Sequence, residues 1–197
     1  MAFELSSILK PQLIKVPLDG DSKRSAIDEL CDLVCTSSSV TDPENFRKAV
    51  WEREGQRSTG IGEGLAIPHG KCPGVREITM SIGIPEAPLE FEAIDGEPVR
   101  MIVLLASPAD RIADHIQALG RISKFMSDPT VRSRAYSADC GEDLYQLLTG
   151  LDAAARGLMA RHGCESACHG YVVGRLSYPG YVCISLNDEI VHGIGSA

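Results

Sequence analysis

The sequence predicts an α/β domain, and three observations support this fold class. Apolar runs of strand length alternate with segments that repeat apolar residues at helical spacing. The 197 residues are enough for one sizeable core, and 44% of them are hydrophobic, which is too many for a disordered chain. The longest purely apolar run, residues 101–106, has the length of a strand and not of a membrane span, so we expect no membrane insertion.

The N-terminal part is predicted to hold one strand and two helices. Residues 12–18 can form the strand. Asp21 or Ser22 can cap a first helix, whose apolar residues fall at i, i+3, i+4 and i+7: Ile27, Leu30, Cys31 and Val34. A second helix is expected from residues 42–43, an Asp-Pro pair, to about Gly55, because proline is tolerated in a first helical turn.

The middle of the chain is predicted to supply the central strands. A glycine-rich loop, residues 60–64, leads into the short apolar segment 65–67. Two strands follow, at 78–84 and 99–106, and a turn-rich loop at 91–98 separates them.

Two helices and an extension complete the prediction. A helix that opens at Pro108 and Asp110 should run to about residue 128, with one apolar face made of Ile112, Ile116, Leu119 and Ile122. A last helix is expected from about 141 to 158. We place a domain boundary at residue 150, which separates a domain at 4–150 from a Gly- and Cys-rich extension at 151–197. In that extension, residues 171–173 and 181–184 should form a β-hairpin around Pro179-Gly180.

Charge and cysteine content exclude several function classes. The net charge is −8, from 19 basic and 27 acidic residues, so nucleic-acid binding is not expected. The N-terminus lacks a basic region followed by a hydrophobic one, so we expect no secretory signal and a cytoplasmic location. We therefore expect the seven cysteines to be reduced thiols, and an odd count fits a disulfide framework poorly.

The segment 53–71 carries the strongest functional signal. It does not match a P-loop, since five residues separate Gly64 from Gly70 and Cys72 follows Lys71. It does not match the dinucleotide-binding fingerprint either. What remains is His69 between a proline and a glycine, and a neutral imidazole nitrogen is a competent nucleophile toward phosphorus. The alternative is a structural histidine at the end of a strand.

Two further residues are candidates for the same site. His115 lies at i+3 from Ile112 and i−4 from Leu119, along the apolar face of its helix, so it is either a core histidine or a site residue over the strand ends. The fork of Arg53 could hold a phosphoryl group bidentately, whereas most arginines at helix ends are simply solvated.

Several segments together resemble one family, the mannitol/fructose class (type 2) of bacterial phosphotransferase-system enzyme IIA, which includes the nitrogen-regulatory IIA proteins. The matching segments span about residues 5–148 and keep the family's order: Arg53-Glu54, Ser58-Thr59-Gly60-Ile61-Gly62, Ala66-Ile67-Pro68-His69-Gly70-Lys71, Asp95-Gly96-Glu97-Pro98-Val99 and Asp114-His115-Ile116-Gln117-Ala118-Leu119. The resemblance implies a mixed β-sheet with helices on both faces.

The resemblance also implies a function and a site. His69 would be the phosphorylated histidine, flanked by His115 and Arg53. It would accept a phosphoryl group from an HPr-type carrier and pass it to a IIB domain or act as a phosphorylation-dependent regulator. Backbone N–H groups of the glycine-rich segment would donate further hydrogen bonds to the phosphoryl oxygens: those of Gly60, Gly62, Gly64 and Gly70. No metal, nucleotide or other cofactor is implied. A regulatory binding module that keeps the fold without the transfer step is the alternative.

Two other groups of residues were weighed as sites. Cys72 could pair with His69 as a Cys-His nucleophile, but a chance neighbour is the simpler interpretation. The extension has a cluster that the resemblance does not cover: His162, Cys164, Cys168 and His169. It could bind zinc, although its spacing is not that of a standard finger, and ordinary cysteines in a small appendage are the alternative.

Overall fold

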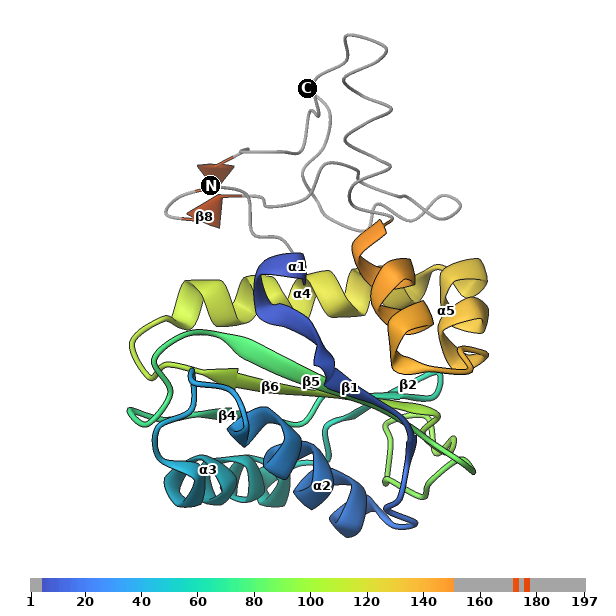
Figure 1. The fold of residues 1–197 in the computed structure, drawn as a ribbon, viewed down its shortest axis with the longest axis horizontal. Helices are drawn as coiled ribbons and strands as arrows, with labels where there is room; N and C mark the ends of the chain where they lie inside the picture. Colours follow the sequence, from blue (N-terminus) through green and yellow to red (C-terminus); the bar gives the residue numbers. More distant parts are fainter. Residues whose placement is uncertain (1–4, 151–171, 174–175, 178–197) are drawn as a thin grey trace, which may run out of the picture.

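A computed structural model describes residues 5–150, 172–173 and 176–177 of the chain (Figure 1). Its main sheet has six strands: β1 (Leu9–Leu18), β2 (Gly60–Gly62), β3 (Leu65–Ala66), β4 (His69–Lys71), β5 (Thr79–Pro85) and β6 (Met101–Ser107). The helices are α1 (Leu5–Ile8), α2 (Lys23–Cys35), α3 (Pro43–Gln56), α4 (Ile112–Ser127) and α5 (Pro129–Tyr136). Residues 141–150 are helical as well.

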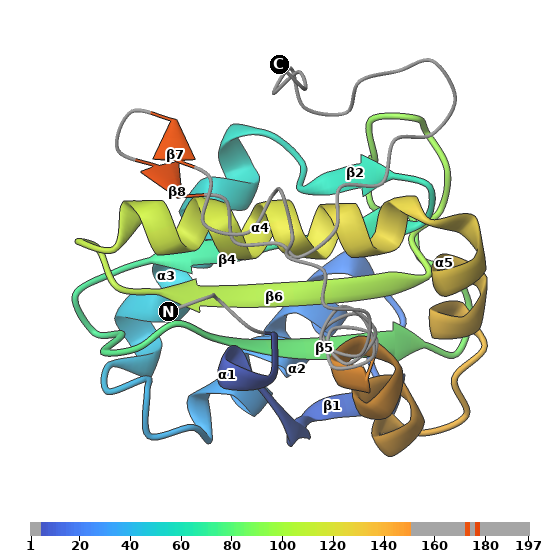
Figure 2. The ribbon, with the colours of Figure 1, turned by 90° about the horizontal axis from the view of Figure 1, so that it is seen from above.

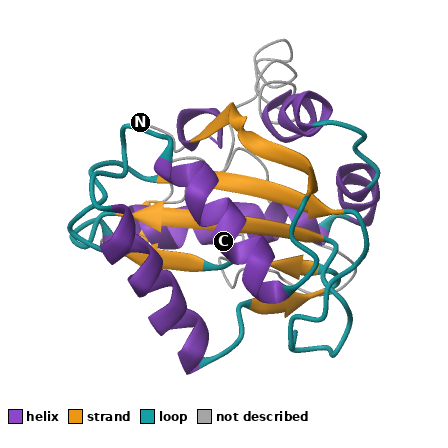
Figure 3. Ribbon diagram, turned by 60° about the horizontal axis from the view of Figure 1, so that its bottom comes forward, coloured by secondary structure: helices purple, strands orange, loops and turns teal. Residues whose placement is uncertain are grey.

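The sheet is mixed and lies between two layers of helices, which confirms the predicted fold class. Its order is β1-β5-β6-β3-β2, and β4 also pairs with β6. Strand β6 runs antiparallel to β5 but parallel to β3 and β4. Helices α2 and α3 cover one face, and α4 covers the other with α5 beside it (Figures 1 and 2). Figure 3 shows the strands with helices in front and behind.

Strand β6 joins the two halves of the core, because its side chains alternate between the faces of the sheet. Met101, Val103 and Leu105 belong to the buried cluster under α4, which includes Ile122 and Met126. Ile102, Leu104 and Ala106 belong to the cluster under α2 and α3, which is filled by Ile27, Leu30, Phe46 and Val50, among others. All seven residues of β5 and of β6 are buried, as their continuous apolar runs predict.

Helix starts follow the predicted capping residues where the sequence has a clear cap. Ser22 caps α2 by accepting the N–H of Ser25, and Asp42 caps α3 by accepting the N–H of Asn45. Helix α5 was not predicted. Asp128 caps it with proline in the first turn, but among its residues only Ala135 is buried, so its apolar periodicity is too weak to be recognised.

The predicted apolar face of α4 was partly wrong. Ile112 and Ile116 are 55% and 53% exposed, although Ile122 is buried and Leu119 packs against the core. The side that meets the sheet instead carries His115, Ala118, Ile122 and Met126. Both series of residues have helical spacing, and periodicity alone does not tell which one faces the sheet.

Residues 60–64, predicted as a glycine-rich loop, form strand β2 and the tight turn that joins it to β3 in a hairpin. Gly62 and Gly64 have φ angles of +102° and +81°, and Glu63 between them has 53°. This left-handed backbone favours glycine, which explains Gly62 and Gly64 without a ligand. The Glu63 N–H donates to Asp95 Oδ2 at 2.6 Å, which ties the hairpin to the 91–98 loop.

One short pairing of the extension lies within the described residues. Strand β7 (Val172–Val173) pairs antiparallel with β8 (Leu176–Ser177), whereas the prediction paired residues 171–173 with 181–184. The expected Pro179-Gly180 turn and residues 181–184 lie outside the described residues. Among the described helices, none is long and apolar enough to cross a membrane.

We expect a chain that ends after Leu158 to stay folded. The described members of the two buried clusters lie between Leu5 and Leu148, and they cover both faces of the main sheet. The truncated chain should unfold in one cooperative thermal transition with a Tm within a few degrees of the full chain. Loss of that transition would show that the extension completes the core.

Candidate functional site

His69 is the first residue of β4, and the pairing of β4 with β6 fixes its position. His69 lies beside Leu105, and Lys71 lies beside Ser107. The carbonyl of Pro68 accepts the Leu105 N–H at 2.9 Å, so the backbone is held immediately before the histidine as well. The His69 side chain is half-buried at the end of a short strand.

Helix α3 packs directly on this strand at Gly70. A Cβ at Gly70 would lie 2.9 Å from Cγ2 of Val50 and 3.2 Å from a ring carbon of Phe46. Glycine therefore allows α3 to approach β4 closely, and this sets the distance between the end of the helix and His69.

The tautomer of His69 follows from its hydrogen bond. Nδ1 lies 2.8 Å from the carbonyl oxygen of Ile67, which can only accept, so the neutral ring carries its proton on Nδ1. The lone pair is then on Nε2. A neutral imidazole with a free Nε2 is the form that can attack an electrophile.

The second predicted histidine lies next to the first. His115, in the first turn of α4, is 4% exposed, and its ring centroid is 5.2 Å from that of His69 with the planes tilted by 58°. Its Nδ1 lies 2.8 Å from the hydroxyl oxygen of Ser107, the last residue of β6. His115 is therefore both a buried residue and a neighbour of His69, so the two interpretations open from the sequence are not exclusive.

Both imidazoles are neutral near pH 7. Burial, together with positive charge on His69 and Lys71, lowers the pKa of His115 to about 4. Burial also lowers the pKa of His69, although the Ile67 carbonyl opposes this shift. The cations Arg53 and Lys71 lower the pKa of His69 as well, whereas the carboxylate of Glu54 raises it.

Arg53 lies in the last turn of α3, three residues after Val50, which contacts Gly70, so both are on one helix face. One guanidinium nitrogen, Nη1, donates to the carbonyl of Arg57 at 2.8 Å. The structure thus brings together His69, His115 and the charge of Arg53.

The structure does not bring Gly62 and Gly64 to His69. Leu65 pairs with Met101 and His69 with Leu105, so Leu65 is about 13 Å from His69 along the strand direction, at roughly 3.3 Å per residue, and the hairpin tip lies beyond Leu65. Cβ atoms at these glycines would meet Asp95, Arg100 and Tyr136. Gly60 packs against Ala93, and the N–H of Gly60 donates to Ser58 Oγ at 3.3 Å.

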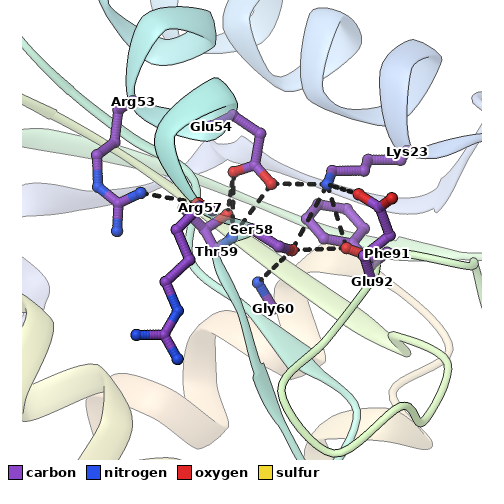
Figure 4. Close-up of polar contacts among 9 residues, drawn as sticks. All are labelled: Lys23, Arg53, Glu54, Arg57, Ser58, Thr59, Gly60, Phe91 and Glu92. Carbon is purple, nitrogen blue, oxygen red and sulfur yellow. Dashed lines mark hydrogen bonds and ion pairs between the residues drawn. The ribbon is translucent and has the colours of Figure 1, made fainter.

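Sequence reasoning missed three residues that contribute to the site. Lys71 adds positive charge beside both histidines, and Ser107 holds the His115 ring. Glu54 is buried and binds Thr59 (Figure 4). The sequence feature that could have pointed to Glu54 is its position next to Arg53, in a helix that packs on β4.

The other candidate sites gain no support from the structure. Cys72 is buried in the cluster under α2 and α3, and burial raises the pKa of its thiol, which disfavours the thiolate. His162, Cys164, Cys168 and His169 lie outside the described residues. In the part of the chain that the structure describes, no group of three or more His, Cys, Asp or Glu could hold a metal ion.

Comparison with known proteins decides the family. Residues 7–150 match the family model described as "Phosphoenolpyruvate-dependent sugar phosphotransferase system, EIIA 2". The chain belongs to this family. The nitrogen regulatory protein of Escherichia coli K12 is 35% identical over 149 residues, which cover 74% of this chain and 90% of that protein. The fructose-specific EIIABC component of Bacillus subtilis is 26% identical over 76% of this chain and 24% of its own length.

Solved structures of type-2 IIA proteins share the fold. The nitrogen regulatory protein IIA-Ntr of Neisseria meningitidis has a TM-score of 0.68 at 28% identity, over 74% of this chain and 99% of that one. The E. coli mannitol enzyme IIA, solved in complex with phosphorylated enzyme IIB, has a TM-score of 0.63 at 20% identity, over 73% and 99%. At that identity the likeness concerns the fold alone.

We predict that both histidines of this IIA domain titrate below the usual His value of about 6.5, His115 near pH 4. Unfolded His115 then binds a proton at a higher pH than folded His115 does, so stability is lost as pH falls from about 6.5 to about 4. NMR titration of the ring protons measures the two values. The His115→Asn variant should lose less stability over that range. A His115 pKa at or above 6.5 would contradict the prediction.

Proposed function

We propose that this chain is a phosphocarrier of the phosphoenolpyruvate-dependent phosphotransferase system. His69 accepts a phosphoryl group from the phosphohistidine of an HPr-type carrier and passes it to a IIB domain or to a regulated protein. The observation that carries the proposal is the His69–His115 pair, in which the Ile67 carbonyl holds Nδ1 of His69 and leaves Nε2 free.

The transfer needs no cofactor in this scheme. The Nε2 lone pair of His69 attacks phosphorus, the N–P bond of the donor phosphohistidine breaks, and its electron pair returns to the donor imidazole. Such a transfer requires in-line positioning and stabilisation of the equatorial oxygens, with little covalent work by the protein. Because His69 is neutral near pH 7, no proton has to leave Nε2 first.

Charged and polar neighbours have complementary roles. The guanidinium of Arg53 and the ammonium of Lys71 offset the negative charge of the phosphoryl group. If Ser107 donates its hydroxyl proton to Nδ1 of His115, the proton of that neutral ring is on Nε2, where it serves as a hydrogen-bond donor to a phosphoryl oxygen. The low pKa of His115 keeps this ring neutral, so it adds no further positive charge to those of Arg53 and Lys71.

A regulatory role is the second candidate, and the names of the relatives favour it. The E. coli protein at 35% identity is a nitrogen regulatory protein and matches over 90% of its length, whereas the B. subtilis fructose component matches over 24%. In this alternative, partner proteins distinguish the phosphorylated from the free form of His69. Binding of candidate targets to both forms would separate regulation from relay.

The first prediction concerns His69 itself. Incubation with phosphoenolpyruvate, enzyme I and an HPr-type carrier should add one acid-labile phosphoryl group to the wild type and none to His69→Ala. Intact-mass spectrometry before and after acid treatment measures the addition. An unmodified wild type, with the carrier itself phosphorylated, would contradict the phosphocarrier proposal and leave the non-catalytic binding module.

The second prediction separates the roles of the two histidines. His115→Ala should slow phosphorylation by about tenfold to a hundredfold and still reach one phosphoryl group, because His115 stabilises the group and is not the nucleophile. Rapid-quench time courses measure the rate. An unchanged rate in a folded variant would show that His115 is only a core residue.

A further inference from the structure

A buried carboxylate lies one residue after Arg53, at the end of α3. The side chain of Glu54 is 3% exposed. Oε1 accepts the Thr59 N–H at 3.1 Å, and Oε2 accepts the Thr59 hydroxyl at 2.5 Å (Figure 4). Glu54 therefore closes a short loop between the last turn of α3 and the residue before β2.

Lys23, in the first turn of α2, neutralises this carboxylate. Nζ of Lys23 lies 2.8 Å from Oε1 of Glu54 and donates to the carbonyl of Phe91 at 3.2 Å. The same ammonium lies 5.0 Å from the centroid of the Phe91 ring. Its other carboxylate neighbour, Glu92, is 86% exposed in its side chain, so Glu54 is the buried partner.

Ser58 extends the network to the start of β2. Its hydroxyl donates to the Phe91 carbonyl at 2.6 Å and accepts the Gly60 N–H at 3.3 Å. Three segments far apart in sequence thus meet around one carboxylate: the start of α2, residues 54–60 and residues 91–92 (Figure 4).

The network bears directly on Arg53. The guanidinium of Arg53 donates to the carbonyl of Arg57. Arg57 belongs to the loop of residues 54–59, whose two ends are joined by the hydrogen bonds between Glu54 and Thr59. Helix α3 is also fixed at Val50 by its contact with Gly70, the neighbour of His69. Contacts on both sides therefore determine where the Arg53 guanidinium lies relative to His69.

A buried ion pair is a weak source of stability, because desolvation of both charges offsets most of their attraction. Orientation is what the charged network adds, since each carboxylate oxygen accepts a hydrogen bond in a defined direction. Glu54 therefore fixes the orientation of the groups that bind it, which an apolar residue of the same size would not do.

We propose that Glu54 is a positioning residue, which, held by Lys23 and Thr59, fixes the end of α3 so that Arg53 presents its guanidinium to the phosphoryl group on His69. The proposal rests on the proposed function, since it assigns Arg53 to that group. Glu54 acts through Arg53 and touches neither donor nor phosphoryl group.

Kinetics of the full chain test the proposal through a double-mutant cycle. Glu54→Gln keeps the shape of the side chain and should slow phosphorylation by an HPr-type donor by about tenfold, as a small misplacement of a catalytic group does. In an Arg53→Ala background, Glu54→Gln should cause no further loss beyond about twofold. Glu52→Gln is the matched control, because Glu52 is an exposed carboxylate of the same helix, and its rate should be unchanged.

The pKa of His69, measured by NMR in the unphosphorylated protein, gives a second cycle that needs no donor. Arg53→Ala should raise this pKa, because a nearby cation is removed, and Glu54→Gln should lower it, because a nearby anion is removed. If Glu54 positions Arg53, the rise caused by Arg53→Ala is smaller in the Glu54→Gln background. Thr59→Val replaces only the hydroxyl by a methyl group. In this background the rise of the His69 pKa caused by Arg53→Ala should also be reduced, but by less. This variant serves as the test if Glu54→Gln does not fold.

An equal rise in both backgrounds, with rate losses that multiply, would overturn the proposal. A wild type that accepts no phosphoryl group would instead contradict the proposed function. The pKa cycle would still decide whether Glu54 positions Arg53.

Discussion

The parallel pairing of the three-residue strand β4 with β6 is the constraint on which the rest of the site depends. It places His69 beside Leu105, two residues before Ser107, and Ser107 in turn holds the ring of His115. Strand β6 is buried along its whole length and supplies both halves of the core, so it cannot shift without exposing apolar side chains on both faces. Because β4 is paired with this fixed strand, the position of His69 is fixed as well, although β4 has only three residues.

Burial gives the two histidines the chemistry that the proposed transfer needs. Each imidazole has one nitrogen bound to the protein, His69 to a carbonyl and His115 to a hydroxyl. Each has a lowered pKa because the protonated ring would be poorly solvated. The imidazoles therefore add no positive charge before transfer, and the positive charge beside His69 comes from Arg53 and Lys71.

Helix α3 connects this chemistry to the other side of the sheet. Its close approach at Gly70 and its buried Glu54 fix the two ends of the turn that carries Arg53. The same carboxylate binds Lys23 of α2, so two helices and the 91–92 segment share one buried charge. Removing that charge would change the geometry of the site without touching either histidine.

The sequence by itself determined the α/β class, the central strands and the capped starts of α2 and α3, because these features rest on apolar runs and capping residues, and its resemblance to one family over several separate segments singled out His69, His115 and Arg53 as candidates. It did not determine which stripe of α4 faces the sheet, that residues 60–64 form a hairpin whose tip lies away from His69, or the pairing of Val172–Val173. The Lys23–Glu54 pair was equally hidden, since its partners are 31 positions apart. Tertiary structure decided these points, because each depends on which segments meet across the sheet, and that information is not contained in any one window of sequence.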